Sequence, residues 1–231
     1  MTTSLTGRML VTGASAGIGA ALARRLAPTA SELVLVARRR DRLEALAGEL
    51  RAGHPQLGVT VRPTDLADTS AVSALADEIL AAGPIDVLIN NAGLGQECRF
   101  VDQDWDRIAQ LIAVNVTATT ALVRRVGAAM AARGAGAIMV VGSGAGQMPM
   151  ANGAVYAATK HYVHGLCESW RLELAGTGVT RQSWRPARST PSSTRSPAWT
   201  RARPRARRSG CGSAPTTARR RPWRPCAATL R

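Results

Sequence analysis

Short runs of apolar residues alternate along the chain with longer segments in which apolar residues recur at helical spacing. The apolar runs predict buried strands at residues 8–12, 32–37, 59–62, 85–89 and 137–141. Helices are expected at residues 20–27, 41–50, 69–82, 104–132 (as one helix or two) and 153–175. This alternation is typical of the α/β class and predicts a Rossmann-type doubly wound parallel sheet with helices on both faces.

Polar and glycine residues gather near the carboxyl ends of the predicted strands. Gly13, Arg38, Asp65, Asn90 and Ser143 each stand at or just beyond such an end. Ligands of open parallel sheets bind outside the carboxyl ends of the strands. We therefore expect these residues to meet at one ligand site.

A glycine-rich turn joins the first predicted strand to the first helix. Residues 13–19 read Gly-Ala-Ser-Ala-Gly-Ile-Gly. Bare backbone N–H groups at such a turn and the helix dipole favour an anion such as a phosphate. The spacing is Gly-x-x-x-Gly-x-Gly, not the commoner Gly-x-Gly-x-x-Gly, and a plain tight turn is the alternative.

The end of the second predicted strand bears on the choice of cofactor. An acid at this point accepts hydrogen bonds from a free ribose 2′-hydroxyl, whereas an arginine suits a 2′-phosphate. Ala37 and Arg38 stand where the acid would be, so NADP(H) is preferred and NAD(H) is the alternative. A solvated basic helix start is the alternative explanation of Arg38. Asp65 is a candidate for the adenine amino group or an ordinary acid at a helix start.

Three polar side chains are expected around the fifth strand and the helix after it. Ser143 follows the strand, and Tyr156 and Lys160 are four residues apart, which places them on one face of a helix. Lys160 is the only lysine in the chain. A phenol that exchanges a proton with an alcohol oxygen needs positive charge nearby, and an ammonium supplies it. A surface helix pair is the alternative.

Two further segments carry amides. Residues 90–93 read Asn-Asn-Ala-Gly after the fourth strand, and their small side chains would let a ligand approach the backbone. Asn115 lies on an otherwise apolar helix face. A buried amide whose hydrogen bonds are satisfied needs no further function, so that alternative stays open for Asn115.

Taken together, these residues resemble the classical short-chain dehydrogenase/reductase family over about residues 7–180. Residues 12–19 are similar to its cofactor motif and residues 90–93 to its structural motif. Asn115, Ser143, Tyr156 and Lys160 are similar to its catalytic tetrad.

The resemblance implies hydride transfer between a nicotinamide and a small carbonyl or alcohol substrate. Tyr156 would be the general acid or base, Lys160 would hold the nicotinamide ribose and stabilise the phenolate, and Ser143 would bind the substrate oxygen. Asn115 would support a water-borne proton relay behind Lys160. A homodimer or homotetramer is expected, partly through helices 104–132 and 153–175. The residues expected to bind the cofactor are Gly13, Ser15, Ala16, Gly17, Ile18, Gly19, Arg38, Asp65, Leu66, Asn91, Ala92, Gly93, Tyr156 and Lys160.

Positive charge is concentrated in the carboxyl-terminal part of the chain. The formal net charge is +15, and 14 arginines with no acid lie in residues 181–231. Residues 1–180 are predicted to be an incomplete dinucleotide-binding domain, and residues 181–231 an Arg/Pro/Ser-rich tail that is disordered or derived from a frameshift near residue 181. On that hypothesis the sixth and seventh strands of the family are lost, and the enzyme is weakened or is a cofactor-binding pseudoenzyme. Nucleic-acid binding through the tail is a weaker alternative, because the tail has no reader motif, and no specific nucleic acid is expected.

The cysteines and the lengths of the apolar runs bear on metal binding, redox state and membrane association. Cys98, Cys167, Cys211 and Cys226 have no metal-ligand spacing, so no metal site is expected and the thiols are predicted to be reduced, as in a cytoplasmic protein. No apolar run approaches 18 residues, and no membrane association is expected. The substrate is not specified. Four residues are expected to border its pocket: Gln96, Cys98, Met148 and Met150.

Overall fold

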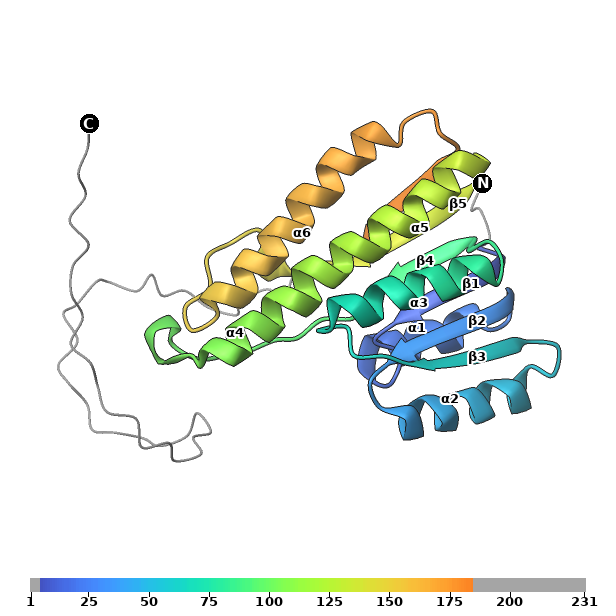
Figure 1. Cartoon of the computed structure of the whole chain (residues 1–231), viewed down its shortest axis with the longest axis horizontal. Coiled ribbons are helices and arrows are strands. Elements are labelled where there is room, and N and C mark those ends of the chain that lie inside the picture. The colour runs from blue at the N-terminus through green and yellow to red at the C-terminus, as the bar shows by residue number, and fades with distance from the viewer. Residues whose placement is uncertain (1–4, 185–231) are drawn as a thin grey trace, which may run out of the picture. The chain divides into compact units, whose positions relative to one another are not determined.

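The computed structural model describes residues 5–184 of the 231-residue chain (Figure 1). The strands in this part are β1 (Gly7–Thr12), β2 (Ala30–Ala37), β3 (Gly58–Pro63), β4 (Val87–Asn90), β5 (Gly136–Val141) and β6 (Val179–Trp184). The α-helices are α1 (Gly17–Leu26), α2 (Arg40–Gly53), α3 (Thr69–Ala81), α4 (Trp105–Ile112), α5 (Thr119–Arg133) and α6 (Ala154–Glu173). Three shorter helical segments are η1 (Phe100–Asp102), η2 (Ala113–Ala118) and η3 (Gly144–Gly146).

The strands form one parallel sheet in the order β3-β2-β1-β4-β5-β6. The chain builds outward from β1 to β3, then returns to pair β4 with the other side of β1. The order therefore reverses between β1 and β4, and this switch point is where doubly wound sheets leave room for a ligand. The predicted Rossmann-type fold is confirmed.

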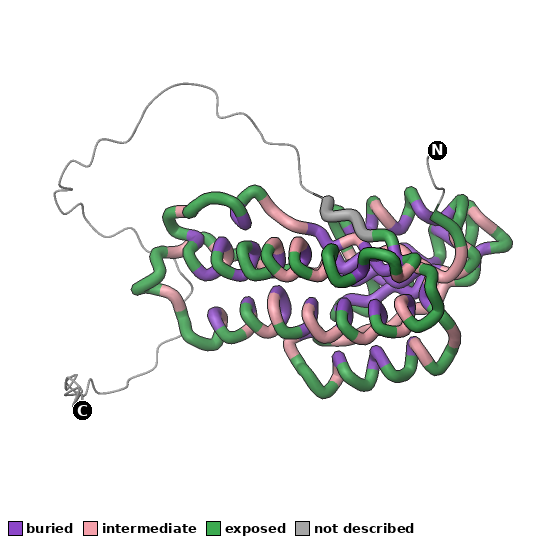
Figure 2. Tube along the Cα trace, turned by 90° about the horizontal axis from the view of Figure 1, so that it is seen from above, coloured by how far each residue is buried: buried purple, intermediate pink, exposed green. Residues whose placement is uncertain are grey.

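Two apolar cores lie on the two faces of the sheet. One contains residues of α1 and α2, such as Ala23 and Leu43, packed on Leu33 and Leu35 of β2. The other contains residues of α3, α5 and α6 packed on the opposite sides of the same strands. Figure 2 shows buried positions recurring along the helices among exposed ones, as expected where a single face of a helix packs on a sheet.

The predicted segment at residues 104–132 is two α-helices joined by a π-helical stretch. The carboxylate of Asp104 caps α4 by accepting a hydrogen bond from the Arg107 N–H at 3.1 Å. α5 ends at Arg133 and is capped by Gly134, whose φ of 72° is the left-handed conformation that glycine adopts readily. The π-helical segment η2 between them carries Asn115. Such wide turns are rare and often occur at functional sites.

One expectation about the carboxyl end of the domain is wrong. The sequence predicts no sixth strand, yet β6 pairs in parallel with β5 from Gly136↔Val179 to Val141↔Trp184. Backbone pairing with β5 forms this strand although residues 179–184 lack a continuous apolar run. β6 also extends beyond residue 180, the predicted end of the dinucleotide-binding domain. The frameshift hypothesis and the disordered tail fall mainly on residues 185–231, which lie outside the described residues.

Within residues 5–184, no helix combines the length and apolarity needed to cross a membrane. The same part of the chain holds no group of three or more His, Cys, Asp or Glu side chains that could bind a metal ion.

Candidate active site

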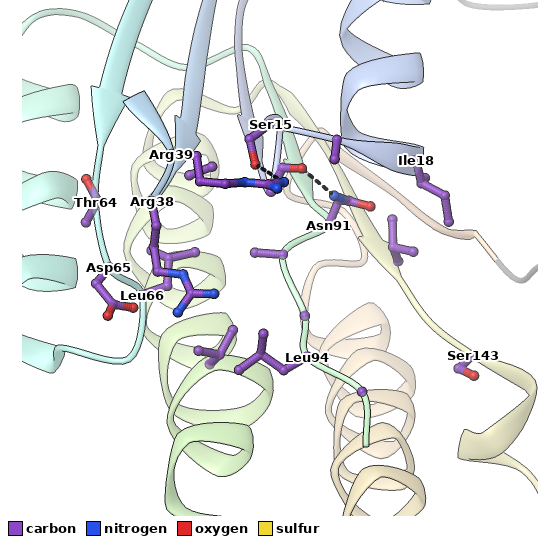
Figure 3. Close-up of a pocket in the computed structure, with 18 of the residues that line it drawn as sticks. Ser15, Ile18, Arg38, Arg39, Thr64, Asp65, Leu66, Asn91, Leu94 and Ser143 are labelled. Carbon is purple, nitrogen blue, oxygen red and sulfur yellow. Dashed lines mark hydrogen bonds between the residues drawn. The ribbon is translucent and has the colours of Figure 1, made fainter. Parts of the chain in front are cut away.

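A cavity of about 590 Å³ lies at the carboxyl edge of the sheet, above the switch point between β1 and β4 (Figure 3). It is lined by segments that follow β1, β2, β3, β4 and β5 and by the first turns of α6. The predicted site residues that line it are Gly13, Ser15, Ala16, Ile18, Arg38, Asp65, Leu66, Asn91, Ala92, Gly93, Ser143, Tyr156 and Lys160. Gly17, Gly19 and Asn115 are not among the lining residues.

The glycine turn after β1 is closely packed at Gly13 and Gly19. Gly13 has a φ of 68°, and a Cβ on Gly19 would lie 2.3 Å from the Gly13 carbonyl oxygen. No side chain caps the N-terminus of α1, which begins at Gly17. The first N–H groups of α1 therefore lack a side-chain acceptor beside the cavity, an arrangement that suits a phosphate.

Two arginines follow β2 at the rim of the cavity. Both Arg38 and Arg39 are exposed and line it, and the Arg39 guanidinium donates a hydrogen bond to Ser15 Oγ at 3.1 Å. Figure 3 shows Arg38 next to Asp65 and Leu66, and Arg39 reaching toward Ser15. Arg38 was predicted from the sequence and Arg39 was not, although Arg39 is the next residue in the same basic run.

The Asn-Asn-Ala-Gly segment, residues 90–93, links the end of β4 to the end of β1 by hydrogen bonds. Thr12 Oγ1 accepts hydrogen bonds from the N–H groups of Asn91 and Ala92, both at 3.0 Å. The side-chain amide of Asn91 donates to the Thr12 carbonyl at 2.9 Å. The Asn90 amide donates to Thr119 Oγ1 at 3.0 Å. These bonds fix the strand ends that form the floor of the cavity.

Asn115 binds the segment that follows β4. Its Oδ1 accepts from the Leu94 N–H at 2.8 Å, and its Nδ2 donates to the Leu94 carbonyl at 2.9 Å and to Thr159 Oγ1 at 3.0 Å. The side chain is buried, and both amide protons and the oxygen are bonded within the protein. The Asn115 side chain is thus a buried amide whose hydrogen bonds are all satisfied. It links the loop after β4 to α6.

Lys160 is buried beside Tyr156 at the inner end of the cavity. Only 8% of Lys160 is exposed, and its Nζ lies 6.0 Å from the centroid of the Tyr156 ring. The ammonium donates to the Val141 carbonyl at 3.1 Å and has no salt bridge with any acid among residues 5–184. Burial lowers the pKa of Lys160, because desolvation disfavours its charged form.

Ser143 lies across the cavity from the glycine turn, at the end of β5. Its Oγ accepts a hydrogen bond from the Ala145 N–H at 3.2 Å and caps η3. The cavity thus brings a hydroxyl, a phenol and an ammonium to the same end of the sheet. This set can bind and protonate an oxygen atom of a ligand.

The residues expected to border a substrate pocket do not line this cavity. Cys98 donates its backbone N–H to the Asn152 carbonyl at 2.7 Å, and the side-chain oxygen of Gln96 is buried without a hydrogen-bond partner among the described residues. The lining residues that are not among the expected site residues supply backbone or apolar surface, apart from Arg39 and the hydroxyl of Thr64. They are Ala37, Arg39, Thr64, Leu94, Gly95, Val114, Val141 and Gly142.

Known proteins resemble this chain in sequence over most of its length. A family model described as short chain dehydrogenase matches residues 8–198. The chain is 36% identical over 180 residues to "Ketoacyl reductase HetN" of Nostoc sp., a match that covers 77% of this chain and 62% of that protein. Matches to the first three curated relatives span between 62% and 67% of the relatives' own length.

Solved structures resemble the fold closely. A metagenomic short-chain oxidoreductase in complex with NADP has a TM-score of 0.75 and 36% identity, over 80% of this chain and 85% of that one. A short-chain dehydrogenase from Sphingobium yanoikuyae in complex with NADPH has a TM-score of 0.74 and 38% identity, over 78% of this chain and 70% of that one.

Proposed function

The chain belongs to the short chain dehydrogenase family, and from this premise we propose that it is an oxidoreductase that transfers a hydride between NADP(H) and the carbon of a small carbonyl or alcohol. The proposal is carried by the residues that line the cavity. One cavity extends from the glycine turn and Arg38 to Ser143, Tyr156 and Lys160. One elongated ligand could therefore contact the phosphate-binding turn and the proton-transferring phenol together.

The residues present fit a phosphorylated dinucleotide. The uncapped start of α1 and the close-packed Gly13 and Gly19 leave backbone N–H groups free for a pyrophosphate. Arg38 and Arg39 stand at the end of β2, where an acid would select a free ribose hydroxyl. The NADP and NADPH in the two similar solved structures support the same preference. Asp65 would bind the adenine amino group, and Asn91, Ala92 and Gly93 would border the nicotinamide half.

When bound, the nicotinamide supplies or accepts the hydride. Tyr156 would donate a proton to the carbonyl oxygen in reduction and remove it from the alcohol in oxidation. Ser143 would hydrogen-bond the same oxygen. The Lys160 ammonium would stabilise the phenolate and bind the nicotinamide ribose, with both roles helped by the low polarity of its surroundings. Asn115 would act through position, because its amide is bonded to Leu94 and Thr159.

A reducible ketone or aldehyde is the proposed substrate class. One similar protein is a ketoacyl reductase, so short 3-oxo thioesters and simple ketones form a suitable test panel. The measurement is NADPH fluorescence titration followed by NADPH oxidation at 340 nm with that panel. Turnover supports the proposal, whereas tight binding without turnover of any substrate favours a cofactor-binding pseudoenzyme. DNA binding at two salt concentrations tests the alternative that the basic tail binds nucleic acid.

We also propose that two copies associate through α4, η2, α5 and α6. Trp105, Ile112 and Val116 fall on one face of α4 and η2, and 71% of Trp105 is exposed. Tyr162 of α6 is also exposed and shares a 3.0 Å hydrogen bond with Thr120 of α5. An apolar face of this kind, carrying a tryptophan and a tyrosine, suits a symmetric contact with a second copy.

A further inference from the structure

Asn152 has an unusual backbone conformation. Its φ is 59°, and among residues 5–184 no other residue except glycine has a positive φ. Asparagine tolerates the left-handed region better than most residues, whereas a β-branched side chain there is strongly disfavoured. Such a conformation persists only where the surrounding structure enforces it, and these places are often functional.

The surroundings of Asn152 connect it to the start of α6. Its carbonyl accepts the Cys98 N–H at 2.7 Å, which joins the turn before α6 to the segment after β4. The next residue, Gly153, is the N-cap of α6, and its carbonyl accepts the Ala157 N–H at 2.8 Å. Tyr156 therefore lies one helical turn after the residue with the left-handed conformation.

The segment after β4 is held to α6 at a second point. Asn115 binds both backbone groups of Leu94 and donates to Thr159, and Thr159 Oγ1 in turn donates to the Tyr156 carbonyl at 2.8 Å. Residues 94–98 are thus fixed at one end by Asn115 and at the other by Asn152. A change of φ at residue 152 would break the second tie and turn the first residues of α6.

The side chain of Asn152 takes no part in this arrangement. It is exposed, and the bond to Cys98 and the first bond of α6 run through the backbone carbonyls of Asn152 and Gly153. The backbone conformation is what matters, so a glycine at the same position should preserve the turn. The glycine turn at residues 13–19 and Arg38 lie on other elements and should be unaffected.

We infer that Asn152 is a positioning residue whose left-handed turn, tied to Cys98, sets the direction in which α6 carries Tyr156 into the site. This inference rests on the proposed function for the role of Tyr156. The turn and the two ties place the phenol relative to residues 94–98.

The test compares four variants of the full chain. Asn152→Val and the milder Asn152→Ala disfavour the left-handed turn, and Asn152→Gly preserves it. Ala151→Val is the matched control, because residue 151 is exposed and lies outside the left-handed region. For each variant, kcat, KM and the Kd for NADPH are measured, and circular dichroism checks folding. If Asn152→Val does not fold, Asn152→Ala carries the comparison.

We expect Asn152→Val to lower kcat by about 10- to 100-fold, as a displaced catalytic group does, with the Kd for NADPH changed less than about twofold. Asn152→Gly should stay within about threefold of the parent, and Ala151→Val should match the parent. An unchanged kcat in the valine and alanine variants overturns the inference. Equal damage from glycine and valine does so too, because it would assign the effect to the amide.

A second readout separates this inference from the proposed function. The chain has two tyrosines, so fluorotyrosine labelling in a Tyr162→Phe background leaves Tyr156 as the single 19F signal. This resonance should move in Asn152→Val and keep its parent position in Asn152→Gly and Ala151→Val, whether or not any substrate turns over. Identical spectra in all variants would contradict the positioning role. Absence of turnover in the parent would contradict the proposed function alone.

Discussion

Lys160 shows how a single residue links stability to chemistry in this protein. Its ammonium is buried, touches the Val141 carbonyl and has no acidic partner in residues 5–184. A buried charge without a counter-charge is unfavourable for folding, yet it is the arrangement that stabilises a neighbouring phenolate. The site therefore holds a group that opposes stability in the absence of ligand.

The pH dependence of stability tests this interpretation. The pKa of Lys160 is lowered in the folded protein, so the unfolded chain binds the proton at a higher pH than the folded chain does. Between the lowered folded pKa and about 10.4, the usual lysine value, stability should rise with pH. Relative to Lys160→Met, the parent should gain unfolding free energy across this window in urea titrations, and below the window the difference should be constant. A difference that does not change up to pH 10.5 would contradict a lowered pKa.

Arg38 is the residue-scale determinant of the proposed cofactor preference. Arg38→Asp should weaken NADPH binding by about 10- to 100-fold, the usual effect of losing a charge-assisted hydrogen bond, while NADH binding changes less. Fluorescence titration with both cofactors measures the ratio. Arg42→Asp on the exposed face of α2 is the control, because it makes the same charge change outside the cavity lining. An equal loss for both cofactors would argue against a 2′-phosphate site.

At the scale of elements, the packing of α6 on α5 holds in place the helix that carries the proposed catalytic residues. Gly127 of α5 leaves room for the Trp170 ring of α6, since a Cβ at residue 127 would lie 2.3 Å from the ring atom Cζ2. α6 also carries Tyr156 and Lys160 toward the cavity. Close contact between a glycine and a tryptophan thus fixes the distance between the two helices.

A pair of glycine substitutions tests this packing. Gly127→Ala should destabilise the protein by about 1–3 kcal/mol, because the added methyl group overpacks the Trp170 ring. Gly165→Ala in α6 has open space around its Cβ and should stabilise by up to about 1 kcal/mol through helix propensity. Urea denaturation of the two variants gives both values. A Gly127→Ala variant as stable as Gly165→Ala would show that Trp170 moves aside without cost.

The sequence predicted the elements whose signal is local. Apolar runs marked β1 to β5, and the spacing of Tyr156 and Lys160 placed them on one helix face. The π-helical segment at Asn115, the strand β6 and the contact between Arg39 and Ser15 depend on partners far along the chain. The periodicity of apolar residues and the composition of a segment do not reveal such distant partners. β6 in particular forms because it pairs with β5.

At the scale of the whole molecule, the proposed contact between copies sets the oligomeric state. Trp105→Arg places a charge in the exposed apolar face and should shift the protein toward monomer, with Kd for self-association raised at least about tenfold. Light scattering coupled to size-exclusion chromatography measures the mass. Arg42→Glu on the exposed face of α2, an element outside the proposed contact, is the control. A parent that is already monomeric at high concentration would refute the proposed contact.

The proposed function depends most on Tyr156 as the group that exchanges a proton with the substrate oxygen. The direct measurement is the rate of NADPH oxidation at 340 nm by the parent and by Tyr156→Phe, with the same ketones and thioesters and at saturating cofactor. We predict that the variant binds NADPH within about twofold of the parent and loses about 10²- to 10⁴-fold in kcat, the usual contribution of a positioned acid or base. Equal rates of oxidation by the two proteins would contradict the account.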